Sequence, residues 1–214
     1  MDTEDVRLAV YRSFAETGRA PEPDSLPDGA LRELHKERHL VLDRDDRIVM
    51  AHPFAAVPLG FSAMGRATLW WGGCAWDSFA LAHLLPDAPD VLVGTRCPGC
   101  GAALAWVVDR TAPPAGEEMA HFLTPAARMW DDVLHTCGHQ RLFCGEECVA
   151  AWLERTGHER GYVMDLSTLW RLAQGWYAGR LDRGYQRREP SEAKEYFRSV
   201  GLRGAFWGLD DVRG

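Results

Sequence analysis

The sequence predicts an α+β protein in which an N-terminal winged-helix-like module is followed by a mixed β-sheet domain flanked by helices. Apolar residues recur at helical spacing near both ends of the chain. Short apolar runs separated by turn residues fill the middle, as expected for strands. At the start of the chain the order helix, helix, strand, strand is the outline of a winged-helix unit.

The N-terminal module is predicted to span residues 1–52. Val6, Val10 and Phe14 form an apolar stripe on its first helix, which Gly18 ends. The order of elements would suit DNA binding or a small packing module in front of an enzyme. We favour packing, because the second helix, ALRELHKERH, balances its few cations with two glutamates. We expect one helix over residues 4–17 and a second helix, capped by Asp28, that ends at about residue 39. Strands are expected at 40–42 and 47–50, joined by an Asp-rich turn.

The second domain is predicted to span residues 53–214 and to carry all the cysteines. Residues 52–71 have the pattern of strand, turn and strand, and lead into a helix that begins at Cys74. The C-terminal segments STLWRLAQGWYAGRL and, from Ser191, SEAKEYFRSVG are amphipathic and are expected to be packing helices. In between, we expect strands on both sides of a CPGCG knuckle within 91–109, a short strand in AHFLTP, and strand, knuckle and helix over 130–157.

Composition and charge narrow the function classes. The chain has 214 residues, of which 46% are hydrophobic and 26% charged, as in an ordinary globular protein. A net charge of −7 argues against nucleic acid as a partner. No apolar run approaches the ~20 residues that span a bilayer, and the acidic start MDTEDVRLAVYRSF does not resemble a signal peptide. We therefore expect a cytoplasmic protein without a membrane partner.

The six cysteines all lie between residues 74 and 148. In a cytoplasmic chain they should stay reduced, and such a set is more typical of metal binding or catalysis than of disulfides. Cys74 and Asp77 lie three residues apart at the start of a predicted helix, so their side chains share a face. The positive end of the helix dipole should lower the pKa of the thiol. The alternative is a buried structural cysteine and an aspartate that only caps the helix.

Three segments resemble, in order and spacing, the organomercurial lyase (alkylmercury lyase) family. WGGCAWDSFALAHLL is similar to the family segment in which a catalytic cysteine precedes the catalytic aspartate by three residues. VGTRCPGCGAAL resembles the segment with a structural cysteine, matched here by Cys97. MWDDVLHTCGHQRLF resembles the segment with the second catalytic cysteine, matched by Cys137. The similarity covers most of residues 1–155, and the C-terminal helices match only loosely.

The resemblance implies that Cys74, Asp77 and Cys137 are catalytic. One thiolate would capture the organomercurial, both would then bind mercury, and Asp77 would protonate the carbon. Mercury is soft and prefers thiolates, which fits this ligand set. The implied products are a hydrocarbon and Hg(II). The implied partners are a small organomercurial substrate, low-molecular-weight thiols and a mercuric reductase, and no organic cofactor is expected.

The remaining cysteines form a second set. Cys97 and Cys100 stand in C-P-G-C-G, and Cys144 and Cys148 stand in C-G-E-E-C. A C-x2-C knuckle followed by a second cysteine pair is typical of a structural zinc site. The segment LFCGEECVAAWL also resembles the last part of small treble-clef modules, in which the final cysteine lies on a helix. The alternatives are four reduced cysteines without metal, or a thiol relay that carries Hg(II) away.

Several functions remain open at this stage. The leading hypothesis is an enzyme that cleaves carbon–mercury bonds by protonolysis. A non-catalytic soft-metal binding protein would keep the cysteines but would not need Asp77. A family member acting on a different substrate and a winged-helix metal-responsive regulator are further alternatives. His135 and His139, which flank Cys137, could tune that thiol or bind metal, or could simply lie on an exposed loop.

Overall fold

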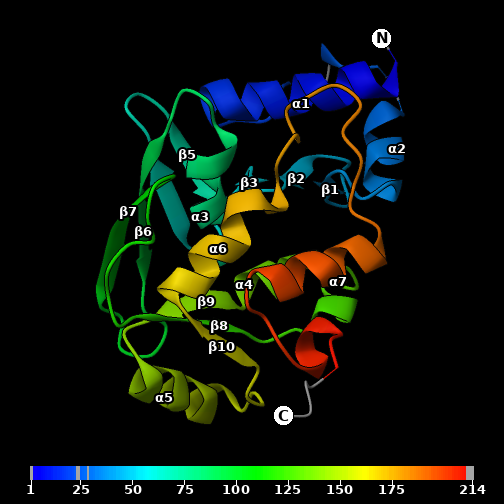
Figure 1. Cartoon of the computed structure of the whole chain (residues 1–214). Helices are drawn as coiled ribbons and strands as arrows, with labels where there is room; N and C mark the ends of the chain where they lie inside the picture. The colour runs from blue at the N-terminus through cyan, green and yellow to red at the C-terminus, as the bar shows by residue number, and fades with distance from the viewer. Residues whose placement is uncertain (1, 23–24, 28, 211–214) are drawn as a thin grey trace.

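A seven-stranded antiparallel sheet forms the centre of the computed structural model, which describes residues 2–22, 25–27 and 29–210 (Figure 1). Its strand order is β1-β2-β3-β5-β4-β6-β7. The strands are β1 (Val41–Leu42), β2 (Ile48–Ala51), β3 (Phe54–Ala55), β4 (Phe61–Met64), β5 (Leu69–Gly72), β6 (Asp90–Arg96) and β7 (Ala103–Asp109).

A second, three-stranded sheet has the order β10-β8-β9. Its strands are β8 (Met119–Phe122), β9 (Gln140–Phe143) and β10 (Tyr162–Asp165). The helices are α1 (Thr3–Thr17), α2 (Ala30–Lys36), α3 (Ala75–Leu84), α4 (Val133–Gly138), α5 (Glu146–Thr156), α6 (Leu166–Trp176) and α7 (Pro190–Ser199), with 3₁₀ turns at Ala126–Arg128 and Ala205–Trp207. Among the described helices, none combines the length and the apolar character that a membrane crossing requires.

The α+β class is confirmed, but the expectation of a mixed sheet is wrong. Every strand pairing in the described residues is antiparallel. Short turns join four of the eight neighbouring pairs, β1–β2, β2–β3, β4–β5 and β6–β7, and such turns give antiparallel pairs, whereas parallel neighbours need a crossover. The β6–β7 hairpin is the longest example and carries the CPGCG knuckle at its turn.

The winged-helix module is not confirmed. Its two helices and two strands occur in the predicted order, but β2 pairs with β3 and so continues into the seven-stranded sheet. Helix α1 also contacts β5, where the indole of Trp70 donates to the carbonyl of Phe14 at 2.9 Å. The hairpin of β1 and β2 is therefore one end of the large sheet. Asp28, the expected cap of the second helix, lies outside the described residues. The boundary between residues 52 and 53 stays a prediction, and the strand pairing continues across it.

Helix α3 occupies the core between the large sheet and α6. Its residues Ala75–Ala82 are all buried, as expected for a helix that is apolar on every side. The indole of Trp76 donates to the carbonyl of Leu172 at 3.2 Å and so joins α3 to α6. In Figure 1, α6 crosses the molecule in front of α3. The two C-terminal helices are thus packing elements, as predicted, and α6 packs against the helix that begins at Cys74.

The predicted strand, knuckle and helix over residues 130–157 correspond to β9, the turn after it and α5, but the structure adds a helix before them. The segment that carries Cys137 forms α4, a short helix that the sequence did not predict. Asp132 caps it by accepting a hydrogen bond from the backbone N–H of His135 at 2.9 Å. Cys137 therefore lies on the last turn of a helix, directly before β9.

The cap of α6 gives a test of how firmly this helix is held. The carboxylate of Asp165 accepts from the backbone N–H of Thr168 at 2.6 Å. Asp165→Ala should lower the free energy of unfolding by about 1 kcal/mol, because that N–H loses its partner. Asp165→Asn keeps an acceptor and should change it by less than about half as much. Denaturant unfolding measures both, and equal losses in the two variants would contradict the capping role.

Candidate active site

Cys74 and Asp77 lie where β5 runs into α3. Cys74 is the N-cap residue of α3, and its sulfur accepts from the backbone N–H of Asp77 at 3.4 Å. The glycine before it is needed for close approach. A Cβ at Gly73 would come within 2.3 Å of both Asp77 Oδ2 and the methyl group of Met50. The glycine thus leaves room for the carboxylate to turn back toward the thiol.

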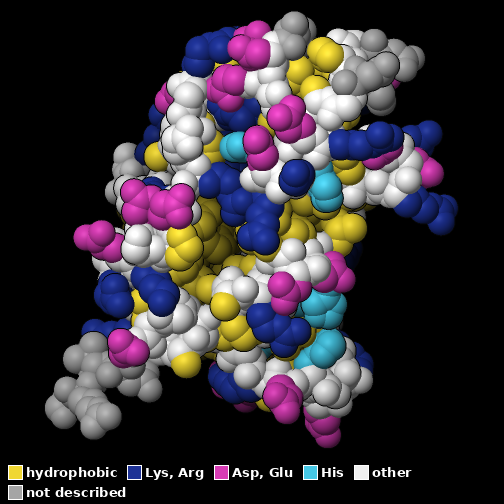
Figure 2. All heavy atoms as spheres, turned by 90° about the vertical axis from the view of Figure 1, so that its right-hand side faces the viewer, with side chains coloured by type: hydrophobic (Ala, Val, Ile, Leu, Met, Phe, Trp, Pro, Cys, Tyr) yellow, Lys and Arg dark blue, Asp and Glu magenta, His cyan; other side chains and the backbone are white. Residues whose placement is uncertain are grey.

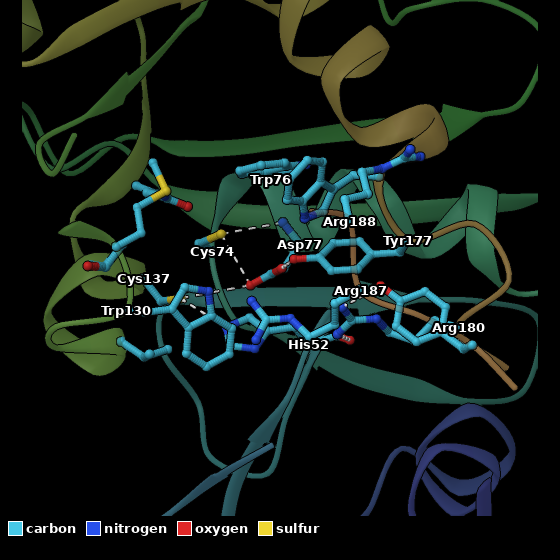
Figure 3. Close-up of a pocket in the computed structure, with 16 residues that line it drawn as sticks. His52, Cys74, Trp76, Asp77, Trp130, Cys137, Tyr177, Arg180, Arg187 and Arg188 are labelled. Carbon is cyan, nitrogen blue, oxygen red and sulfur yellow. Dashed lines mark hydrogen bonds between the residues drawn. The ribbon is translucent and has the colours of Figure 1, made fainter. Parts of the chain in front are cut away.

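The structure brings Cys137 to the same carboxylate oxygen. The Cys74 thiol donates to Asp77 Oδ2 at 3.2 Å, and the Cys137 thiol lies 4.0 Å from that oxygen (Figure 3). All three side chains are buried, with 2%, 1% and 4% of Cys74, Asp77 and Cys137 exposed. The three residues that the sequence singled out therefore meet in one place, although 60 residues separate Asp77 from Cys137.

Three further residues complete this site, and no sequence motif indicated them. The Tyr177 hydroxyl, just beyond α6, donates to Asp77 Oδ1. The guanidinium of Arg180 lies 4.8 Å from the centre of the Tyr177 ring and donates to the carbonyl of His52 at 3.0 Å. His52 Nε2 lies 3.6 Å from the Cys137 sulfur. Tyr177 and Arg180 follow α6, and His52 follows β2. These residues reach the site only because α6 and β2 pack near the start of α3, and no local sequence motif predicts that packing.

Burial decides the protonation of the acid. It raises the pKa of Asp77 to about 6, although the hydrogen bonds from Tyr177 and Cys74 and the charge of Arg180 lower it. Burial lowers the pKa of His52 to about 3, with help from the charges of Arg180 and Arg187, so this imidazole is neutral near pH 7. The carboxyl of Asp77 can consequently gain or lose a proton close to neutral pH.

The thiols differ from the sequence-based expectation. Burial raises the pKa of Cys74 well above its ordinary value, as do its contact with Cys137 and the charge of Asp77, and the backbone N–H of Asp77 only partly offsets this. At Cys137, the contact with Cys74 lowers the pKa, but burial and Asp77 together outweigh it and the net shift is upward. Both thiols are therefore protonated at rest, and they must release a proton when they bind a metal.

These groups line a cavity of about 90 Å³. This is well below the roughly 300–1,000 Å³ of pockets that enclose drug-sized ligands, and it fits a small substrate. The indoles of Trp76, Trp130 and Trp176 form much of the wall. Seen from outside, the face in Figure 2 is hollowed, with hydrophobic side chains inside the hollow and Lys and Arg side chains gathered at one edge.

The second cysteine set also comes together, away from this cavity. The sulfurs of Cys97, Cys100, Cys144 and Cys148 all lie within 4.8 Å of one another, and none of these residues lines the pocket. For the histidines that flank Cys137 in the chain, the sequence left open a role in tuning the thiol, a role in metal binding, or a place on an exposed loop. The rings of His135 and His139 face each other at 4.2 Å, while His52 contacts the Cys137 sulfur.

Comparison with known proteins identifies the family. The family model described as MerB, alkylmercury lyase, matches residues 54–178 of this chain. This is more than half of the sequence and includes both thiols, Asp77 and Tyr177. The chain belongs to the alkylmercury lyase family. The resemblance seen in the three sequence segments is thereby confirmed, and the chain is assigned to an enzyme family.

The fold agrees with that family. The crystal structure of the mercury-bound form of MerB2 superposes with a TM-score of 0.62 at 18% sequence identity, covering 80% of this chain and 87% of that chain. At this identity the similarity concerns the fold alone. No curated protein sequence matches the chain. His52 and Arg180 lie just outside the matched residues 54–178, so the family model does not describe these two parts of the alkylmercury lyase pocket.

The raised pKa of Asp77 predicts how stability depends on pH. Because the folded state binds this proton more tightly than the unfolded chain, the carboxyl contributes stability below about pH 4, and that contribution is lost as the pH rises through about 6. Asp77→Asn cannot ionise, so it should gain stability relative to the native protein as the pH rises. The gain should reach about 3 kcal/mol at most above pH 6.

Unfolding by denaturant between pH 4 and 8, with the thiols kept reduced, measures this difference. Asp165→Asn is the matched control, because it makes the same chemical change at an exposed helix cap. A stability difference between Asp77→Asn and the native protein that stays constant over the whole range would contradict an elevated pKa at Asp77.

Proposed function

We propose that Cys74, Cys137 and Asp77 cleave the carbon–mercury bond of small organomercurials by protonolysis. The observation that supports this most directly is that both buried thiols approach the same oxygen of one buried carboxylate. Two thiols supply the ligands that mercury prefers. A carboxylate between them can take a thiol proton and pass it to the carbon.

The proton balance of the reaction follows from the resting state. The substrate enters as an alkylmercury bound to a thiol. The first protein thiol replaces that ligand at mercury, and its proton leaves with the displaced thiol. The second protein thiol then binds mercury and gives its proton to the Asp77 carboxylate. Asp77 finally transfers this proton to the carbon, the electron pair of the carbon–mercury bond forms the new C–H bond, and Hg(II) stays on the two thiolates.

The environment of Asp77 favours the last step. A carboxyl with a pKa of about 6 is a suitable general acid and base near neutral pH. Tyr177 holds Oδ1, which leaves Oδ2 directed at the sulfurs. The tryptophan walls keep water from competing as a proton source or as a mercury ligand. Excess low-molecular-weight thiol would then remove Hg(II) as a bis-thiolate or deliver it to a mercuric reductase.

The mouth of the cavity supports a thiol-bound substrate that carries negative charge. Arg180, Arg187 and Arg188 line the cavity, and Arg187 lies 4.6 Å from the centre of the Trp130 ring. Within the described ranges, no carboxylate forms an ion pair with these three arginines. The protein as a whole carries a net charge of −7, so this local excess of positive charge is a specific feature of the pocket. Carboxylates on the carrier thiol would be attracted to it.

Methane release from methylmercury in excess thiol tests the proposed reaction. Asp77→Asn should lose at least about 100-fold in rate while still binding mercury, because the proton donor is gone but both sulfurs remain. The control, Asp165→Asn, should release methane at the native rate. Methane release by Asp77→Asn within a few-fold of the native rate would contradict the role of the carboxylate. Tight mercury binding by the native protein without methane would support a soft-metal binding protein instead.

Removing the positive charges of Arg187 and Arg188 tests separately whether the pocket prefers substrates bound to an anionic thiol. Arg187→Gln combined with Arg188→Gln should raise the KM for methylmercury bound to glutathione by about 3- to 10-fold, since two favourable charges are removed. The KM for methylmercury bound to 2-mercaptoethanol, a neutral thiol, should change little. Arg203→Gln, an exposed arginine that does not line the cavity, is the control. Equal changes for both carriers, or no dependence on salt, would contradict charge recognition.

A further inference from the structure

The four cysteines outside the cavity lie where the two sheets approach each other. Cys97 and Cys100 belong to the turn between β6 and β7 of the large sheet, and Cys144 and Cys148 to the junction of β9 and α5 beside the small sheet. All four are free thiols. In Figure 1, α5 lies at the lower end of the molecule, below both sheets. Two chain segments more than 40 residues apart thus contribute one cysteine pair each.

The sulfur positions match a tetrahedral metal site. The Cys100 and Cys144 sulfurs are 3.6 Å apart, and all four lie within 4.8 Å of one another. Zinc–sulfur bonds of about 2.3 Å in a tetrahedron place the sulfurs about 3.8 Å apart. Within the described residues, no histidine or carboxylate joins this set. Four thiolates without an open position are typical of structural rather than catalytic zinc.

The surrounding backbone is built to hold the sulfurs in place. A Cβ at Gly99 would lie 2.4 Å from the carbonyl oxygen of Cys148, so only glycine allows the knuckle to approach α5 this closely. Arg155, also on α5, donates to the carbonyls of Pro98 and Gly99 and so ties the knuckle to the same helix. The backbone N–H of Cys144 donates to the Cys97 sulfur at 3.5 Å, as expected for a group that stabilises a thiolate ligand.

The turn that carries Cys97 and the start of α5 pack around a small core of their own. Among the described residues, its buried members are Cys97, Phe143, Val149 and Trp152, whereas Phe122 and Leu142 of the small sheet belong to the main core. Arg141, which donates from β9 to the carbonyl of Leu59 at 2.9 Å, is one further link between the sheets.

We propose that Cys97, Cys100, Cys144 and Cys148 bind one structural zinc ion that links the β6–β7 turn to the start of α5, in addition to the main core that the two sheets share. Strand β9 begins directly after α4, which carries Cys137, whereas Cys74 and Asp77 are positioned by β5 and α3. The zinc ion therefore adds one link between the part of the protein that carries Cys137 and the part that carries the other two residues. It is a second metal site, independent of the mercury chemistry, and its binding can be measured without any assay of the lyase.

Metal analysis of the full chain, purified from cells grown without mercury, tests the site. We expect about one zinc ion per chain, and less than about a tenth of that in Cys100→Ser and Cys148→Ser. Cys137→Ser is the matched control and should keep its zinc. Protein refolded with Co(II) should show the intense visible absorption of tetrahedral thiolate coordination. Absence of both stoichiometric zinc and this absorption would overturn the proposal, and so would stoichiometric iron in place of zinc.

Hydrogen exchange tests the role of the ion and does not depend on variants that fold. Removing zinc from the native protein with a chelator should accelerate amide exchange in α4, β9 and α5 by at least about tenfold. The amides of β4 and β5, which pair with each other in the large sheet, should change little. Uniform acceleration over the whole chain, or none in β9, would contradict a zinc ion that links the small sheet to the large one.

Discussion

The buried carboxyl group of Asp77 is the constraint on which the site depends. Two thiols approach one of its oxygens and a tyrosine hydroxyl donates to the other. Removing a carboxylate from water is costly, and here the hydrogen bonds and the charge of Arg180 compensate only in part, so the pKa rises to about 6. An exposed aspartate would stay ionised at neutral pH and could not deliver a proton to carbon. The tryptophan walls, the close-approach glycine before Cys74 and the depth of α3 all serve this desolvation.

The fold supplies these groups from segments that are distant in the chain. Helix α3, buried on every side, presents Asp77 at its first turn, and α4 brings Cys137 from the edge of the second sheet. The end of α6 contributes Tyr177, and Arg180 follows a few residues later. The geometry of the pair of thiols therefore depends on how firmly the two sheets are held together. The proposed zinc ion acts at this point, through the turn of the β6–β7 hairpin and the start of α5.

Much of this could be predicted from the sequence because the signals are local. The double glycine before Cys74 and the apolar run after it indicated a helix beginning at this residue, and cysteine spacing grouped Cys97 with its partners. The order of two helices and two strands at the start of the chain was predicted, but the winged-helix module is not confirmed. The hairpin continues through β3 into the large sheet, where β3 pairs with β5, and no local signal indicates that pairing. The helix before Cys137 depends on capping by Asp132, which competes with a strand-like apolar pattern. Tyr177 sat in a helix that periodicity assigned to packing, and only its tertiary contact reveals a second role.

The most direct test follows the proton itself. Infrared difference spectroscopy during a single turnover of methylmercury, with ¹³C-labelled aspartate and Asp77→Asn as the reference, reports the protonation of this carboxyl. A protonated carboxyl band of Asp77 should appear when both thiols bind mercury and disappear at the rate of methane release. If methane forms while Asp77 remains ionised throughout, the carboxyl is not the proton donor, and the chemistry assigned to this site would have to be abandoned.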